Sequence, residues 1–176
     1  MSKLSVPVRS EDHRQGQEDA GCILVEYGDY ECPSCGEAYP IVKRLQKHFG
    51  EGLLLVFRNF PLSQMHPRAE SAAETAEFAG SHKKFWEMHD LLFENQERLE
   101  DSLLMILTEE LHLAPAELQD ALTNKVFQPR VRADFAGGAR SGVNGTPTFF
   151  INGQRHDGSF DFDSLAGAIQ AATTSR

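Results

Sequence analysis

The sequence predicts an α/β protein in which a central, mixed four-stranded sheet is flanked by helices and interrupted by an inserted all-helical subdomain. Two short apolar runs around an amphipathic segment give the order β–α–β near the start, and two short strands and a helix give β–β–α at the end. The long stretch between them has only helical periodicity. We therefore expect an N-terminal extension over residues 1–20, an α/β domain built from residues 21–65 and 143–176, and a helical insertion over residues 66–142.

The first half of the sheet follows a polar extension that we expect to be irregular. The apolar run Ile23–Tyr27 predicts a buried strand, and Leu53–Phe60 predicts a second one. Between them, five apolar residues fall on one helix face, namely Ala38, Ile41, Val42, Leu45 and Phe49. Gly50 ends this helix, and a crossover of this length predicts parallel pairing of the two strands.

The second half of the sheet follows five predicted helices. Residues 146–151 predict a third strand, and the Asn152-Gly153 pair predicts a tight hairpin turn into a fourth antiparallel strand over residues 154–157. Asp161 is the expected N-cap of a final amphipathic helix.

Charge and hydropathy narrow the function classes. The chain has 17 Lys and Arg against 26 Asp and Glu, a formal net charge of −9, which argues against a nucleic-acid partner. No apolar run approaches the roughly 20 residues needed to span a bilayer, so we expect no membrane partner. The N-terminal residues do not resemble a signal peptide, which predicts a cytoplasmic location.

The Cys32-Pro33-Ser34-Cys35 segment carries the predicted chemistry because it joins the first strand to the following helix. A thiolate at a helix N-terminus is stabilised by unpaired backbone N–H groups and by the helix dipole. Pro33 suits the first helical position. We expect Cys32 to be the nucleophile and Cys35, one turn further on, to be the resolving thiol of disulfide exchange.

Two other interpretations of the cysteine pair are half of a zinc site and a chance spacing. A structural zinc ion needs four ligands, usually from two such pairs, and the sequence holds no second pair. We therefore expect no metal, and also no organic cofactor, because the two cysteines carry the electrons themselves.

Several segments resemble DsbA-like thiol–disulfide oxidoreductases. The resemblance lies in GDYECPSC over residues 28–35 and GVNGTPTFF over residues 142–150, and also in FRNFPL over 57–62 and KFWEMHD over 84–90. It covers nearly the whole chain from about residue 6. It implies a thioredoxin-like fold interrupted by a helical domain, in agreement with the element order.

The resemblance also implies roles for residues beside the cysteines. Thr146-Pro147 matches the family's cis-proline loop, whose Thr146 backbone would pair with an extended substrate and whose Pro147 ring would keep metals from the thiols. An ordinary proline at the start of a strand is the alternative. Glu26, inside an apolar strand, matches a buried acid that would exchange a proton with Cys35, and an exposed edge-strand glutamate is its alternative.

The residues around Cys32 predict a thiol whose pKa is not strongly lowered. Ser34 donates only a neutral hydrogen bond, and Asp29 and Glu31 place negative charge that we expect to raise the Cys32 pKa. This predicts a weaker oxidant than relatives with a histidine between the cysteines, or a reductant. Cys22 is interpreted as a buried thiol, with an intermolecular link as the alternative.

The leading functional hypothesis is therefore an enzyme that cycles between a dithiol and a disulfide. Its partners would be protein thiols or disulfides, or glutathione, together with a redox partner protein. One alternative is a redox-independent chaperone or peptide-binding module, which would not need Cys32. Another is a glutathione-dependent thioredoxin-fold transferase or isomerase, which would not need Cys35.

Overall fold

The computed structural model describes residues 2–175 and has one mixed sheet with the strand order β1-β3-β2-β4-β5. The strands are β1 His13–Gln15, β2 Cys22–Gly28, β3 Leu53–Asn59, β4 Thr148–Ile151 and β5 Gln154–Arg155. As the crossover predicts, β2 and β3 are parallel, with Glu26 opposite Phe57. Strand β4 is antiparallel to β2 and continues through a hairpin into β5.

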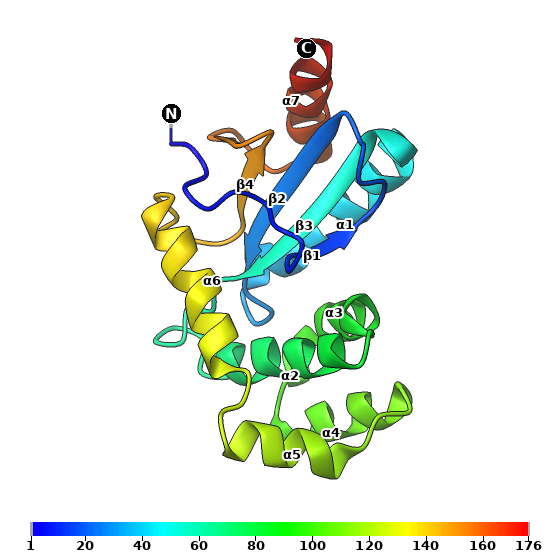
Figure 1. The fold of residues 1–176 in the computed structure, drawn as a ribbon, viewed down its shortest axis with the longest axis vertical. Helices are drawn as coiled ribbons and strands as arrows, with labels where there is room; N and C mark the ends of the chain where they lie inside the picture. The colour runs from blue at the N-terminus through cyan, green and yellow to red at the C-terminus, as the bar shows by residue number, and fades with distance from the viewer. Residues whose placement is uncertain (1, 176) are drawn as a thin grey trace.

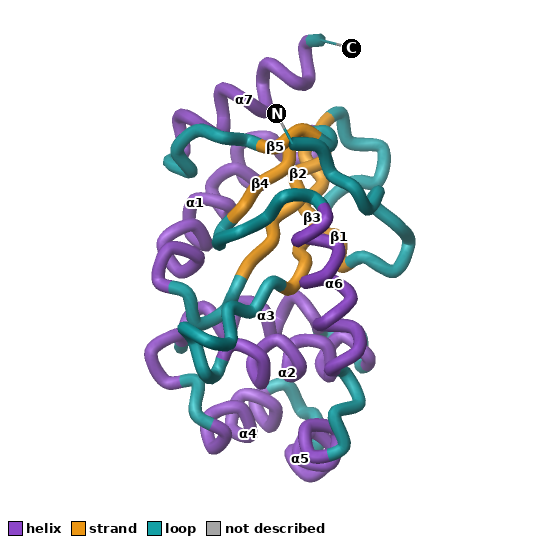
Figure 2. Tube along the Cα trace, turned by 90° about the vertical axis from the view of Figure 1, so that its left-hand side faces the viewer, coloured by secondary structure: helices purple, strands orange, loops and turns teal. Residues whose placement is uncertain are grey.

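Two helices cover one face of the sheet, and the N-terminal segment crosses the other (Figures 1 and 2). The two helices are α1 Pro33–Phe49 and α7 Phe162–Thr174. Alternate residues of β2 serve the two faces: Leu24 packs against α1 and α7, whereas Val25 and Tyr27 pack on the opposite side. The side chain of Asp161 accepts a hydrogen bond from the Ser164 N–H at 2.8 Å, which confirms the predicted N-cap.

Five helices lie between β3 and β4 in the sequence. They are α2 Ala69–Ser81, α3 Phe85–Glu94, α4 Asp101–Glu110, α5 Pro115–Thr123 and α6 Gln128–Arg140. Figure 1 shows α2 to α5 beyond one end of the sheet, while α6 returns towards the strands. Their apolar core also includes Cys32 and Cys35, so the cysteine pair lies where the helical insertion meets the sheet.

The predicted fold class is confirmed, but the prediction of four strands and of an irregular N-terminal extension is wrong. Residues 13–15 form the extra strand, β1, which pairs antiparallel with β3 along the sheet edge. These residues are polar, so no hydrophobic alternation marks them, and their pairing with β3 forms the strand. His13 is also held by an ion pair of 2.8 Å with Glu77 of α2. The two C-terminal strands are shorter than predicted, and the domain boundaries stay a prediction.

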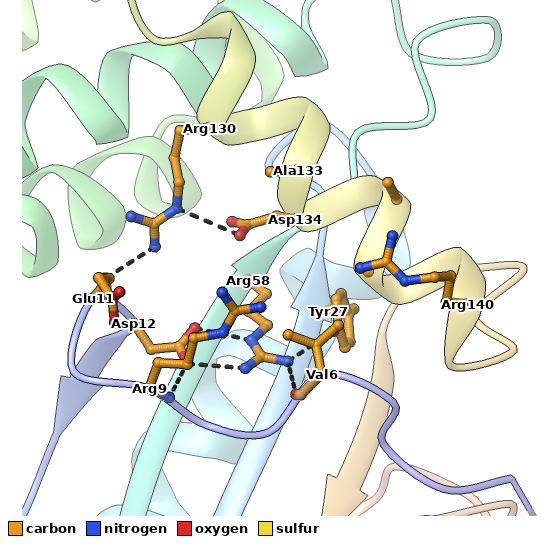
Figure 3. A pocket seen from close by; sticks show the side chains of 12 residues that line it. Val6, Arg9, Glu11, Asp12, Tyr27, Arg58, Arg130, Ala133, Asp134 and Arg140 are labelled. Atoms are coloured by element: carbon orange, nitrogen blue, oxygen red, sulfur yellow. Dashed lines mark hydrogen bonds and ion pairs between the residues drawn. The ribbon is translucent and has the colours of Figure 1, made fainter.

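Arg58 at the end of β3 holds the N-terminal segment against the fold (Figure 3). Its guanidinium makes two hydrogen bonds of 2.9 Å to the Asp12 carboxylate and one of 2.9 Å to the Tyr27 hydroxyl. Its other two bonds reach the carbonyls of Val6 and Pro7, at 2.8 and 3.0 Å. All five of its N–H donors are therefore used within the protein. Among residues 2–175, no helix is both long and apolar enough to cross a membrane.

Candidate active site

The cysteine pair lies at the first turn of α1, directly after the loop that leaves β2. Cys32 is the N-cap residue with extended backbone, and Pro33 occupies the first helical position, as predicted. The Cys32 N–H donates to the Asp29 carbonyl at 3.2 Å, which closes the loop. Only 7% of Cys32 is exposed and none of Cys35, so an incoming sulfur atom reaches Cys32 first.

The surroundings of Cys32 favour its thiolate. A hydrogen bond from the Cys35 thiol is the largest cause that lowers the Cys32 pKa to about 5. The Thr146 side chain and the backbone N–H groups of Cys35 and Ser34 act in the same direction, whereas burial opposes them. The last two donors are N–H groups that a helix leaves unpaired at its start. Ser34 therefore contributes through its backbone.

The expectation of a raised Cys32 pKa is wrong, because the hydrogen bonds to its sulfur outweigh the nearby carboxylates Asp29 and Glu31. Both carboxylates also have partners of their own. Asp29 is 1% exposed, and its Oδ1 accepts the Glu31 N–H at 2.8 Å. Its Oδ2 accepts the Leu62 N–H at 2.9 Å and bonds His66 Nδ1 at 2.8 Å. Glu31 Oε2 accepts the Arg68 N–H at 2.6 Å. Apart from the Glu31 N–H, these partners come from the segment between β3 and α2, which the local sequence around the cysteines does not reveal.

Glu26 lies on β2, the strand that leads into the loop before Cys32, and only 3% of its surface is exposed. Burial raises the pKa of Glu26 to about 8, and its Oε1 has no hydrogen-bond partner among residues 2–175. Burial is also the largest cause that raises the pKa of Cys35, and the charge of Glu26 adds to it. The structure therefore places Glu26 within electrostatic reach of Cys35 and contradicts an exposed edge-strand position.

The loop of Thr146 and Pro147, which the sequence analysis predicts as a cis-proline loop, lies at the start of β4 and faces the cysteines. Pairing of Thr148 with Tyr27 aligns β4 with the end of β2 and brings residues 146–147 beside α1. The Thr146–Pro147 peptide bond is cis, and the Thr146 carbonyl accepts a hydrogen bond of 3.5 Å from Cys32 Sγ. The Thr146 hydroxyl is buried without a hydrogen-bond partner within the described chain. It is therefore available to a thiolate at Cys32.

Gln96 is a site residue that the sequence analysis missed. It lies in a short 3₁₀ helix, Gln96–Arg98, of the helical insertion, and its Nε2 donates to the carbonyls of Cys32 at 2.6 Å and Tyr30 at 3.0 Å. A Cβ at Gly36 would overlap the Gln96 side chain, so this close approach requires glycine. A glycine directly after the second cysteine was the available signal, because glycine inside a helix often marks close packing.

Two further predictions concern metal binding and Cys22. Within residues 2–175, no group of three or more His, Cys, Asp or Glu side chains is arranged to hold a metal ion. Cys22 is fully buried and pairs with Leu53 at the opposite end of β2 from the cysteine pair. This position agrees with the interpretation of Cys22 as a buried thiol.

Comparison with known proteins identifies the family. A family model described as Thioredoxin matches residues 9–171. The chain belongs to the thioredoxin family. Its fold closely matches BdbD from Bacillus subtilis, with a TM-score of 0.89 and 25% identity over 98% of both chains. It also matches α-DsbA1 from Wolbachia pipientis, with a TM-score of 0.83, 18% identity and coverage of 98% and 95%, a likeness that shows the fold alone. The predicted resemblance to DsbA-like proteins is confirmed for the fold and for membership of the thioredoxin family.

Curated relatives of this thioredoxin-family chain are much longer proteins. The Na(+)/H(+) antiporter NhaA 1 of Salinispora arenicola is 42% identical over 170 residues, which cover 96% of this chain and 26% of the antiporter. The protein of the same name from Mycobacterium sp. (strain KMS) is 42% identical over 163 residues, covering 91% of this chain and 26% of the antiporter. The chain thus spans about a quarter of the length of these relatives.

Proposed function

We propose that this chain exchanges disulfides with thiol substrates through Cys32 and Cys35. The observation that carries the proposal is the contrast between the two thiols: the pKa of Cys32 is lowered to about 5, whereas the pKa of the fully buried Cys35 is raised. One thiol is thus a thiolate at neutral pH and lies at the surface of the site. The other is held protonated beneath it until it is needed.

In the reducing direction, the Cys32 thiolate attacks one sulfur of a substrate disulfide, and the other substrate sulfur leaves as a thiolate. Cys35 then loses its proton and attacks Cys32 in the mixed disulfide. The second substrate sulfur leaves as a thiolate, and the Cys32–Cys35 disulfide remains. Two electrons pass from the cysteine pair to the substrate, and the reverse sequence oxidises a substrate dithiol.

The pKa values favour the oxidising direction. A thiolate with a low pKa is a good leaving group, so a mixed disulfide on Cys32 is readily attacked by the second thiol of a substrate. Cys35 leaves first in this direction and needs a proton. With a pKa of about 8, roughly nine in ten Glu26 side chains are protonated at pH 7 and can supply it. The interpretation as a weaker oxidant therefore loses its main premise, and the reduction potential itself stays a prediction.

The cis-proline loop points to extended peptides as substrates. The Thr146 carbonyl already lies 3.5 Å from Cys32 Sγ, so a chain bound to Cys32 would run beside backbone groups of this loop. Protein dithiols are therefore our proposed substrates, with a separate redox protein that restores the disulfide. The predicted cytoplasmic location is untested, and a donor role would conflict with a compartment that keeps thiols reduced.

The test is to trap the mixed disulfide. Cys35→Ser should accumulate a covalent complex with a reduced, unfolded substrate protein, joined at Cys32 and released by dithiothreitol. Cys32→Ser should form no complex and should lose all oxidase and reductase activity, while Cys22→Ser should behave as wild type. If the wild-type protein and Cys32→Ser bind the unfolded substrate equally well and neither exchanges disulfides, the chaperone alternative would be supported. Full glutathione-dependent activity in Cys35→Ser would support the transferase alternative.

A further inference from the structure

A histidine from outside the cysteine motif lies beside the site, bonded to a buried carboxylate. The residue between the motif's proline and its second cysteine is Ser34, which carries no charge. His66 lies in the segment between β3 and α2, far from the motif in sequence, yet its Nδ1 is 2.8 Å from the buried carboxylate of Asp29. Asp29 is only three residues before Cys32.

We infer that His66, held in place by Asp29, is a positioning residue whose imidazolium charge stabilises the Cys32 thiolate and so biases the exchange towards disulfide donation. The inference rests on the proposed function and adds the device that tunes it. His66 does not touch the reacting sulfur; it acts through the electrostatic potential at Cys32.

Hydrogen bonds fix the position of the imidazole relative to the cysteine loop. Asp29 Oδ2 also accepts the backbone N–H of Leu62 at 2.9 Å, and the backbone N–H of His66 donates to the Leu62 carbonyl at 2.8 Å. On the other side, the Cys32 N–H donates to the Asp29 carbonyl at 3.2 Å. The imidazole and the cysteine are thus attached to the same residue, Asp29, which is 1% exposed and cannot readily change partner.

The charged groups around His66 favour its protonated form. Burial opposes its charge, but the hydrogen bond and the charge of Asp29 raise the His66 pKa, and the charges of Cys32 and Glu31 add to this. The coupling between two charges is reciprocal, so a Cys32 thiolate that favours the imidazolium is favoured by it to the same extent. From beneath, the charge of Glu26 acts on Cys35.

The size of the effect follows from its geometry. Hydrogen bonds from Cys35, Thr146 and two backbone N–H groups are the main causes of the low Cys32 pKa, and the partly exposed His66 contributes less than these do. We therefore expect His66 to contribute about half a pKa unit, or roughly a threefold change in the equilibrium constant with glutathione. A threefold change corresponds to about 15 mV for this two-electron couple.

The experiment compares His66→Gln, His66→Lys and His82→Gln in the whole chain. Thiolate absorbance against pH gives the Cys32 pKa, and equilibration with glutathione buffers gives the reduction potential. His66→Gln should raise the Cys32 pKa by about half a unit and make the protein about threefold less oxidising. His66→Lys keeps the positive charge and should stay near wild type. His82 Nε2 lies 3.8 Å from the carboxylate of Glu117 in the helical insertion, so His82→Gln is the matched control and should change neither quantity.

Two results would overturn the inference. One is an unchanged Cys32 pKa in His66→Gln, with thermal unfolding that shows a folded protein. The other is an equal shift in His66→Gln and His66→Lys, which would mean that the imidazole packs rather than acts by its charge. Either result leaves the proposed function intact if Cys35→Ser still traps substrate. Failure of the wild-type protein to exchange disulfides at all would instead remove the proposed function, and the inference with it.

Discussion

The free energy of unfolding of Glu26→Gln should increase relative to that of the wild type as the pH rises. Glu26 is 3% exposed, and its burial raises the pKa from 4.5 to about 8. In the unfolded chain the group ionises near its ordinary value, so between these two pH values the unfolded state binds fewer protons than the folded state. The wild-type protein therefore loses the stability that this group contributes as the pH rises through this window, and the contribution is constant above it.

The magnitude of this penalty can be worked out from the two pKa values. A shift from 4.5 to about 8 corresponds to at most about 5 kcal/mol of destabilisation, and about 3 kcal/mol of it is present at pH 7. Glutamine has nearly the same shape and no charge, so Glu26→Gln removes the pH dependence. A buried amide without partners adds a constant offset, so the change between pH 5 and pH 8 is the quantity to compare.

The assay is urea denaturation of the reduced wild-type and variant proteins at several pH values between 5 and 8. The free energy of unfolding of Glu26→Gln relative to wild type should increase by about 3 kcal/mol across this range. Glu74, which is 7% exposed with a pKa raised by burial to about 7, is the matched control in α2. Glu74→Gln should show a smaller rise and leave disulfide exchange unchanged. A relative stability of Glu26→Gln that does not vary with pH would refute the reasoning.

Three other substitutions test separate parts of the structure. Arg58→Met leaves a buried carboxylate without its partner and should cost about 3–5 kcal/mol of stability, measured with urea; a loss below about 1 kcal/mol would contradict the role of Arg58 in holding the N-terminal segment. Gly36→Ala should displace Gln96 from its two hydrogen bonds and cost about 1–3 kcal/mol, whereas unchanged stability would show that Gln96 can move aside. Thr146→Val removes a hydroxyl that favours the thiolate, so the Cys32 pKa from thiolate absorbance should rise; a fall would be inconsistent with the site described.

The order of the main elements is predictable because it depends on local patterns. The apolar runs of β2 and β3 are buried on both faces, and the amphipathic face of α1 is continuous, so each element is visible in its own residues. The cysteine pair is equally local: a strand end, a proline at the first helical position and a helix lie within a few residues of each other. The hairpin after β4 is signalled by Asn152 and Gly153, both of which have positive φ.

Features that depend on distant contacts are not predictable in this way. Strand β1 is polar and exists because β3 offers an unpaired edge. The charge of Asp29 could be counted from the sequence, but its partners, Leu62 and His66, lie more than 30 residues further on. The expected rise in the Cys32 pKa was wrong because the hydrogen bonds that lower it, including the one from the Thr146 side chain, depend on the folded site and not on the local count of charges.

The central claim is that Cys32 is a thiolate nucleophile at neutral pH, and its rate of alkylation measures this most directly. Reduced protein would be treated with iodoacetamide between pH 3 and pH 10, with the modified residue identified by mass spectrometry and Cys32→Ser as the control. Cys32 should be the residue that reacts, and its rate should reach half of its plateau near pH 5. A midpoint near the ordinary value of about 8.5, or preferential reaction at Cys35, would contradict the claim.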